Sequence, residues 1–349
     1  MKFDYAIAGQ GIAGSLLAWF LIKQGKKVLV VDDGFVHSSS RVAAGIIHPV
    51  TGRRLVKTWQ ADTLISFAVN CYRDIESALH NNFFNEMPLL EIFTSVQHRN
   101  EWMSRSAESD IEKYVDRVLT ADQIPATVIA PLGGILLKQT GWLNVNAFTA
   151  AITQFLKANG SYHTDKIQPH EIIFEEHGIK WKDYECEKLI LCDGYSALTQ
   201  YYFNHLPFIP AKGEVITIHC KNLQFPYIIN QSVFILPLGE NLFKAGSTFN
   251  WKDLSTQTTI EAREHLQQSI KKIINADFEI VNHQAAIRPT TKNRRPFLGF
   301  HPHHNHLAIF NGMGTKGVMM APYYAAQMAS HITEGKELDE EVNVLGRIG

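Results

Sequence analysis

The segment YAIAGQGIAGSLLAWFLIKQGKKVLVVDD, residues 5–33, decides the fold class of this chain of 349 residues. Its apolar patterns predict a buried strand over residues 3–8, a helix over 15–24 that ends at Gly25, and a second strand over 27–31. A GxGxxG pattern at residues 9–14 separates the first strand from the helix, and two acidic residues follow the second strand. This order is typical of doubly wound α/β folds that bind dinucleotides.

Each glycine of the turn has a physical task. Gly9 permits the tight turn, Gly11 lets a pyrophosphate approach the backbone, and Gly14 lets helix and strand pack closely. The N–H groups at the start of the helix then face the anion. Asp32 can accept hydrogen bonds from both ribose hydroxyls, and its charge disfavours the 2′-phosphate of NADP. The segment alone leaves NAD and FAD open. Its candidate binding residues are Gly9, Gln10, Gly11, Ile12, Ala13, Gly14, Asp32 and Asp33.

Composition narrows the class of protein. A hydrophobic fraction of 45% predicts folded domains with a sizeable core. The net charge of −1 provides no excess of positive charge that would attract nucleic acid or anionic membranes. Four widely spaced cysteines indicate free thiols in a reducing compartment. We find neither a signal-peptide pattern nor an apolar run long enough to cross a bilayer. These features predict a cytoplasmic protein without a membrane span.

Hydrophobic patterns along the rest of the chain predict two interleaved domains. Residues 1–50, 141–196 and 285–349 form the dinucleotide-binding domain, and residues 51–140 and 197–284 form a second domain. Helices are expected over 60–80, over the segment capped by Asn144 or Asn146, and over 322–333. The histidine-rich HPHHNH, residues 301–306, lies between two apparent strands with a proline, which indicates a hairpin turn, and no metal site is predicted.

Six further motifs decide the cofactor. They are SSSRVAAGIIHP (38–49), GWLNVNAFTAAITQFLKANG (141–160), KLILCDG (188–194), FILPLGENLFKAGST (234–248), AAIRPTTKNRRPFLG (285–299) and NGMGTKGVMMAP (311–322). Because these motifs follow the opening glycine-rich segment in this order and spacing, the chain resembles the D-amino-acid oxidase, glycine oxidase and sarcosine oxidase family of FAD-dependent oxidoreductases. The resemblance implies an α/β fold, α+β overall, in which a Rossmann-like FAD-binding domain is interleaved with a substrate domain built on a large, mostly antiparallel sheet.

The resemblance also assigns residues to FAD. The stretch from Ser40 to Ile46 would pass the pyrophosphate and the flavin edge, Ile167 would lie near the adenine, and the glycines before the last helix would aim N–H donors at the reduced flavin. Asp193 replaces a small residue of the family, so its carboxylate needs a partner or exposure. FAD is expected to be noncovalent, because no cysteine lies near residues 289–296. These candidates are Ser40, Arg41, Ala44, Gly45, Ile46, Ile167, Asp193, Gly194, Gly312, Gly314, Thr315, Lys316 and Gly317.

Two residues match catalytic positions of the family, and a third candidate, His48, directly follows the AAGII segment. Arg288 would fix the substrate carboxylate with a bidentate fork, unless it pairs with a local acid. Lys244 would stand above the flavin and assist oxygen reduction, unless strand alternation points it to solvent. His48 would line the substrate pocket, or would be a packed loop histidine.

Three other residues bear on the substrate. Phe234 stands where D-amino-acid oxidases carry a substrate-contacting tyrosine, which argues against their type of pocket. Arg53 and Arg54 would extend a pocket for an acidic substrate or lie on the surface.

The resulting hypothesis is an FAD-dependent enzyme that oxidises the C–N bond of an amino acid or N-alkyl amino acid. A hydride would pass to flavin N5, an imine would form, and reoxidation would use O2, giving H2O2, or another acceptor. The alternatives are a relative that acts on a 2-hydroxy acid, one that acts on an amine side chain of tRNA, and a flavin-binding protein without turnover. The sequence leaves substrate identity and oligomeric state open.

Overall fold

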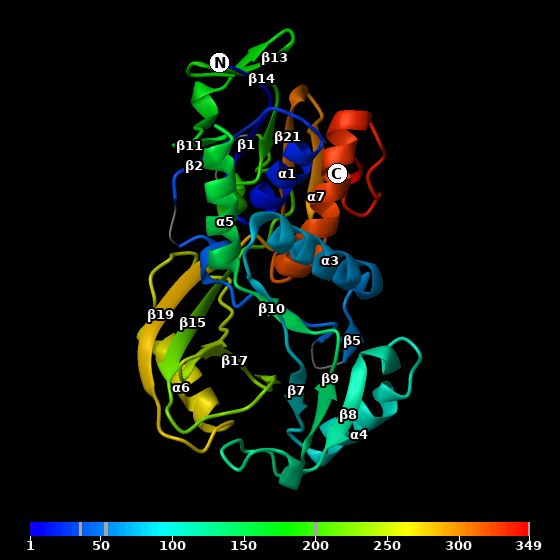
Figure 1. The fold of residues 1–349 in the computed structure, drawn as a ribbon, viewed down its shortest axis with the longest axis vertical. Coiled ribbons are helices and arrows are strands. Elements are labelled where there is room, and N and C mark those ends of the chain that lie inside the picture. Colours follow the sequence, from blue (N-terminus) through cyan, green and yellow to red (C-terminus); the bar gives the residue numbers. More distant parts are fainter. Residues whose placement is uncertain (35–36, 52–54, 199–201, 348–349) are drawn as a thin grey trace.

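The computed structural model describes residues 1–34, 37–51, 55–198 and 202–347, so Arg53 and Arg54 lie outside the described residues. Two large sheets dominate this part of the chain (Figure 1). The first has the order β11-β2-β1-β14-β13-β12, and β21 joins β14 and carries β20. Its strands are β1 (Lys2–Ala8), β2 (Val28–Asp32), β11 (Tyr162–Thr164), β12 (Ile173–Glu175), β13 (Gly178–Trp181), β14 (Tyr184–Leu191), β20 (Phe297–His301) and β21 (His304–Asn311).

The first sheet is a Rossmann-like α/β layer, as predicted. Strands β1, β2, β11, β14 and β21 are parallel neighbours. The runs of buried aliphatic residues in β1 and β2 suit strands covered on both faces. Helix α1 (Ile12–Lys23) packs against α5 (Val145–Ala158) and α7 (Gly317–Glu334), and α7 also contacts α3 (Ala61–Leu79). These helices and the sheet occupy the upper half of Figure 1.

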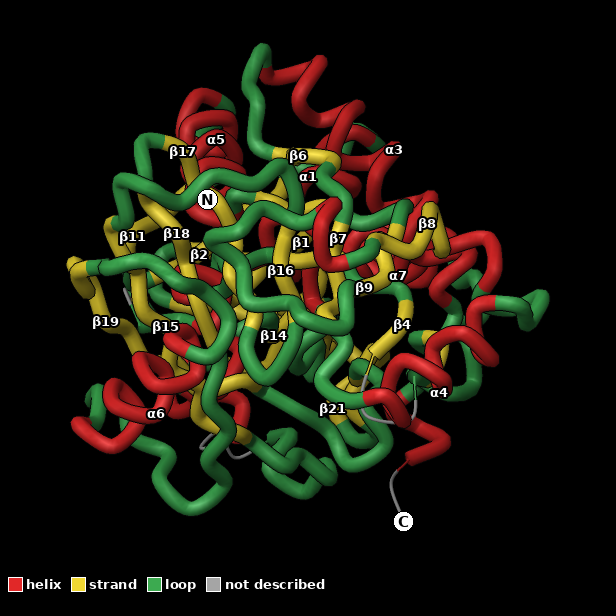
Figure 2. The backbone as a smooth tube through the Cα atoms, turned by 90° about the horizontal axis from the view of Figure 1, so that it is seen from below, coloured by secondary structure: helices red, strands yellow, loops and turns green. Residues whose placement is uncertain are grey.

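The second sheet is mostly antiparallel and fills the lower half of Figure 1. Its order is β19-β15-β18-β17-β16-β7-β9-β8. The strands are β7 (Leu89–Ile92), β8 (Val115–Leu119), β9 (Gly134–Leu137), β15 (Ala211–His219), β16 (Ile228–Asn230), β17 (Phe234–Gly239), β18 (Leu242–Gly246) and β19 (Glu279–Arg288). Helix α6 (Ile260–Lys271) covers one face through Leu266 and Ile270, beside β15 in Figure 2.

The opposite face of this sheet meets the α/β layer. There Val42 of the short helix α2 (Ser39–Val42) packs against Val215 and Ala286. Small elements complete the junction and the periphery. They are β3 (Ile46–Ile47), β4 (Val50–Thr51), β5 (Val56–Lys57), β6 (Phe84–Glu86), β10 (Gly141–Leu143) and α4 (Val96–Ser106).

Three details differ from, or refine, the expectations. Helix α7 begins at Gly317, five residues before the predicted start at Pro322. The proline leaves the Val318 carbonyl without a helical partner, and the buried Tyr72 hydroxyl donates to this carbonyl at 2.7 Å. The N-cap of α5 is Asn144, whose side chain accepts from the N–H of Ala147 at 3.1 Å. The expected hairpin turn joins β20 to β21 and consists of Pro302 and His303, whereas His301 and residues 304–306 lie in the strands.

The predicted boundary between residues 284 and 285 falls inside β19. This strand was not foreseen, and it pairs with β15 along its whole length, from Glu279 to Arg288. The chain therefore leaves the second sheet only after Arg288, which pairs with Ala211 of β15. Among the described residues, no helix is both long and apolar enough to cross a membrane.

Candidate functional site

The glycine-rich turn has the close packing that its pattern requires. Gly9 adopts a φ of +96°, and a Cβ on it would lie 2.7 Å from the carbonyl oxygen of Cys192. A Cβ on Gly14 would lie 1.9 Å from the carbonyl oxygen of Gly9. The N-cap residue of α1 is Gly11, which has no side chain of its own to cap the helix. The turn therefore holds the start of α1 close against the carboxyl ends of β1 and β14.

Asp32 organises this turn. Its two carboxylate oxygens accept the N–H groups of Gln10 at 2.7 Å and Gly34 at 2.8 Å. The Gln10 side chain turns inward, where its amide donates to Ser15 and to the Thr149 carbonyl, both at 3.0 Å. Gln10 thus ties α1 to α5, and its side chain is engaged within the protein.

The segment 38–47 runs past the same turn. The Ser40 hydroxyl accepts the N–H of Ile12 at 3.0 Å, and the Arg41 carbonyl accepts the side-chain amide of Asn146 at 3.1 Å. Beyond α2, Ile46 pairs with Trp142 across β3 and β10. The order of contacts therefore leads from the first turn of α1 toward the second sheet.

Asp193 has the partner that its position demands. The side-chain amide of Asn311 donates to its carboxylate at 3.3 Å and to the Gly194 carbonyl at 2.9 Å. The Asn311 side-chain oxygen accepts the N–H of Gly312 at 2.7 Å. One asparagine therefore joins the ends of β14 and β21 to the second glycine-rich segment.

That second segment leads into α7 and bears a buried cation. The Lys316 ammonium donates to the His48 carbonyl at 3.1 Å, and burial lowers its pKa to about 8. Burial and the nearby Lys316 lower the pKa of His48 to about 3, which keeps the imidazole neutral. The His48 Nε2 atom is buried without a hydrogen-bond partner in the described structure, as is the Thr290 hydroxyl beside Gly314.

Lys244 faces the junction and does not point to solvent. Its ammonium donates to the carbonyls of Val42 and Ala43, both at 3.2 Å, and burial lowers its pKa to about 8. Lys244 pairs with Leu236 of β17, which lies on the same sheet face as Phe234, and Phe234 packs near Val42. Lys244 therefore lies against the segment that was expected to pass the flavin.

Arg288 lies on the same face, between a glycine and an aromatic ring. A Cβ on Gly213 would fall 2.0–2.2 Å from the guanidinium carbon and both terminal nitrogens, so the group lies flat over Gly213. The Phe249 ring centroid is 4.4 Å from the guanidinium carbon. The terminal N–H groups of the Arg288 guanidinium donate to the Ser247 hydroxyl at 2.8 Å and to the Thr248 carbonyl at 3.3 Å.

No acid neutralises Arg288 within the described ranges, so the alternative of a local ion pair is not met. Burial without such a partner lowers the pKa of this guanidinium to about 10. Two of its five donors are occupied by neutral oxygens, which leaves edge donors for an anion.

The other predicted residues divide by exposure. Ile167 is buried in the apolar cluster of β1 and β2, with Ala8 and Val31. Asp33 and Thr315 are exposed. The remaining residues that were predicted to bind FAD lie along the turns and helix starts described above. They are Ala13, Ala44, Gly45 and Gly317.

The residues present fit FAD. Two glycine-rich helix starts lie at the carboxyl ends of parallel strands, a carboxylate ends β2, and two buried lysines lie where an anionic group would compensate their charge. The unpartnered Thr290 hydroxyl and His48 ring nitrogen are consistent with contacts to a bound group.

Comparison with known proteins decides the family. A profile of the family described as FAD dependent oxidoreductase matches residues 4–331. The chain belongs to this family. It is therefore an FAD-dependent enzyme, and its fold and cofactor class agree with the sequence-based prediction.

Individual relatives of this oxidoreductase are distant in sequence. A glycine oxidase from Bacillus licheniformis is 21% identical over 95% of this chain and 93% of its own length. A glycine oxidase from Pseudomonas aeruginosa is 26% identical, but the match spans only 38% of this chain and 37% of that protein. At these identities, the relatives support the fold and the family and do not fix a substrate.

Solved structures share the whole fold. A glycine oxidase from Bacillus cereus superposes with a TM-score of 0.82 at 20% identity and 96% coverage of both chains. An iminodiacetate oxidase from Chelativorans sp. has the same TM-score at 17% identity, again with 96% of both chains covered. An L-proline dehydrogenase from P. horikoshii gives 0.80 at 18% identity, covering 96% of this chain and 94% of that one.

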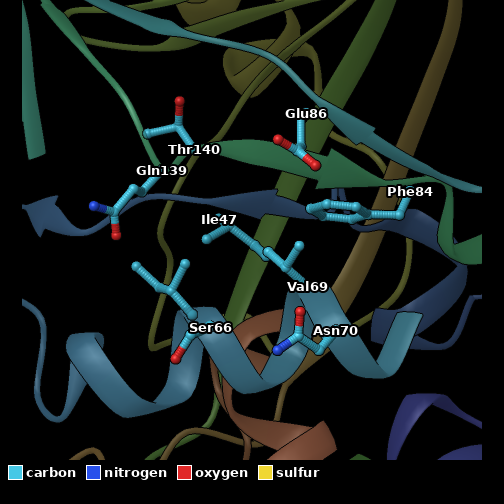
Figure 3. Close-up of a pocket in the computed structure, with 9 residues that line it drawn as sticks. Ile47, Ser66, Val69, Asn70, Phe84, Glu86, Gln139 and Thr140 are labelled. Atoms are coloured by element: carbon cyan, nitrogen blue, oxygen red, sulfur yellow. The ribbon is translucent and has the colours of Figure 1, made fainter. Parts of the chain in front are cut away.

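A separate hollow of the oxidoreductase lies between α3 and the small sheet of β3, β10 and β6 (Figure 3). Ile47 and Phe84 contribute its apolar wall, and Ser66, Asn70 and Glu86 contribute polar groups. Ile47 directly precedes His48, but none of the cations described above lines this hollow.

Sequence reasoning missed Gly213 and Phe249, which enclose Arg288. The only signal was the KGE sequence at residues 212–214, in which a glycine interrupts a strand pattern between two charges. Such a glycine indicates a close approach of another group, but its neighbour depends on the pairing of β15 with β19.

Proposed function

We propose that this oxidoreductase oxidises the C–N bond of an amino acid or N-alkyl amino acid whose carboxylate binds Arg288. The supporting observation is the environment of that guanidinium, which is buried, lacks an acidic partner in the described structure and has both faces covered. A carboxylate must then approach edge-on, in the plane of the group, where bidentate hydrogen bonds are strongest. This constraint would fix the direction in which the substrate α-carbon points.

The two glycine-rich helix starts would hold FAD, which would supply the acceptor for a hydride from the substrate α-carbon and the route of the electrons to O2 or another acceptor. The substrate amine would enter unprotonated, so no separate base is needed and the neutral His48 is compatible with this step. The cation of Lys244, held against residues 42 and 43, would stabilise negative charge that develops during reoxidation.

We also propose that FAD is held without a covalent bond. Cys71 and Cys192 are buried with pKa values raised by burial, which disfavours the reactive thiolate. Precipitation of the purified protein with acid should release all flavin into the supernatant. Yellow colour that stays with the pellet would contradict this proposal.

The function is tested by anaerobic mixing with a panel of amino acids, N-methyl amino acids and 2-hydroxy acids. Bleaching of the flavin absorption band by members of the first two groups is the expected result, and Arg288→Ala should abolish it at low substrate concentration. If only 2-hydroxy acids bleach the flavin band, the substrate is an alcohol and not an amine. A wild-type flavin that none of these compounds reduces would overturn the proposal.

A further inference from the structure

The loop between β18 and α6, residues 247–259, contacts both faces of the second sheet. We name it the clasp loop. Its first part meets Arg288 on the junction face through Ser247, Thr248 and Phe249. Two backbone hydrogen bonds of 2.8 and 3.0 Å then join Asn250 to Lys212 of β15. The loop ends at Thr259, the N-cap of α6 on the opposite face.

Two buried charges of β15 hold the last part of the clasp loop. The Lys212 ammonium lies 2.5 Å from the Asp253 carboxylate and donates to the Ser255 hydroxyl at 3.3 Å. The Glu214 carboxylate accepts the N–H of Thr259 at 2.9 Å and its hydroxyl at 3.0 Å. The same charges therefore bind the loop at residues 253, 255 and 259.

The position of these charges is costly for a strand. The side chains of Lys212 and Glu214 are only 1% and 4% exposed, whereas Ile216 and Ile218, which follow on the same face, are apolar and buried. A buried charge is tolerated only when it is paired and hydrogen-bonded, and an apolar replacement would often be as stable. Within the sheet, the Lys212 ammonium lies 3.6 Å from the Glu214 carboxylate, which also lies 2.9 Å from the Nε2 atom of His283 on β19. The clasp loop supplies their other partners.

The three residues 212–214 act on the same loop from two sides. Gly213 leaves room for the Arg288 guanidinium on the junction face, while its two neighbours hold the clasp loop on the other face. The backbone N–H of Glu214 also donates to the Thr248 hydroxyl at 2.9 Å, beside the carbonyl that Arg288 contacts.

We propose that Lys212 and Glu214 are positioning residues that act through the clasp loop. By holding residues 253–259, they fix Ser247, Thr248 and Phe249 against Arg288 and so set the plane in which a substrate carboxylate binds. The inference rests on the proposed role of Arg288 as carboxylate anchor.

The test compares the wild-type holoenzyme with Asp253→Ala, Asp253→Glu and the control Asp116→Ala. Asp116 is likewise a partly exposed acid paired with a cation, but it lies on β8. Two quantities are measured in each protein. Hydrogen exchange is followed over residues 247–259, and the flavin absorption spectrum is titrated with acetate and with uncharged acetamide.

In Asp253→Ala, we expect faster exchange over the clasp loop and an acetate Kd raised about tenfold, with the acetamide titration unchanged. Asp253→Glu should restore most acetate affinity, and Asp116→Ala should match the wild type in both measurements. Unchanged exchange, or faster exchange with unchanged acetate affinity, would overturn the proposal for the clasp loop alone. A wild-type spectrum that responds to neither acetate nor any amino acid would overturn the role of Arg288 and this proposal with it.

Discussion

Replacing Gly213 with alanine should displace Arg288 while leaving the second sheet intact. The added Cβ would lie 2.0 Å from one terminal nitrogen of the guanidinium, and ordinary van der Waals contact begins at 3.4 Å. The group must therefore retreat by about 1.4 Å. The guanidinium ends a flexible side chain, and the Phe249 ring on its other face is exposed. The displacement therefore falls on these two side chains and not on the backbone of β15.

A shift of this size is large for a group that orients a substrate. A misplacement of about 1 Å costs roughly 100-fold, which corresponds to about 2.7 kcal/mol. We therefore expect KM for an amino-acid substrate to rise by about 100-fold in Gly213→Ala, while the melting temperature stays close to that of the wild type. Steady-state kinetics and thermal unfolding of the holoenzyme measure the two quantities.

A double-mutant cycle with Arg288→Ala isolates the mechanism. If Gly213 acts by making room for the guanidinium, Gly213→Ala should have almost no further effect on KM once that group is gone. Equal losses in the presence and absence of Arg288 would refute the reasoning, as would an unchanged KM in the single variant.

Three further predictions concern the cofactor and the buried charge. Gly14→Ala should lower the melting temperature and weaken FAD binding by about 10-fold or more, because its Cβ would meet the Gly9 carbonyl oxygen at 1.9 Å. The control is Gly346→Ala, whose Cβ would lie in open space. Equal FAD affinity in both variants would contradict the assignment of the first glycine-rich turn to FAD. Asp32→Asn should raise the Kd for FAD about 10- to 100-fold, because an amide cannot accept from both Gln10 and Gly34, whereas the exposed Asp183→Asn should not change a fluorescence titration. Lys244 has a folded-state pKa of about 8, below the ordinary 10.5. Between these pH values the unfolded chain binds the extra proton, so the apoprotein gains stability as pH rises through that window. The higher melting temperature that we expect for Lys244→Met at pH 7 should therefore approach that of the wild type by pH 10, and a difference that grows with pH would be inconsistent with the buried ammonium.

The nucleotide-binding layer was predictable because its signals are local. The glycine turn, the apolar strands and the acid after β2 all lie within residues 3–33, and each has one structural meaning at its spacing. Strand β19 was missed because its polar residues break the alternation. His283 and Gln284 pair with residues of β15, and the only apolar run of three residues in the strand is Ala285, Ala286 and Ile287.

The environment of the candidate site depended on contacts between distant residues. Which way Lys244 points follows from the approach of residues 42 and 43 to the sheet, about 200 positions away in sequence. The clearance over Gly213 follows from the register that pairs Ala211 with Arg288. Such relations are set by tertiary packing, and a single sequence contains no local pattern for them.

The segment that follows β19 has a consequence for how this enzyme can change. Arg288 and Thr290 are two residues apart, the Pro289 carbonyl accepts the N–H of Gly314 at 3.3 Å, and the Thr290 carbonyl accepts the N–H of Ile209 at 2.6 Å. The spacing between Arg288, the proposed carboxylate anchor, and the second glycine-rich segment is thus a property of the main chain. Substitutions around the remainder of a substrate can therefore alter which molecule is accepted without altering how far its anchored end stands from the start of α7.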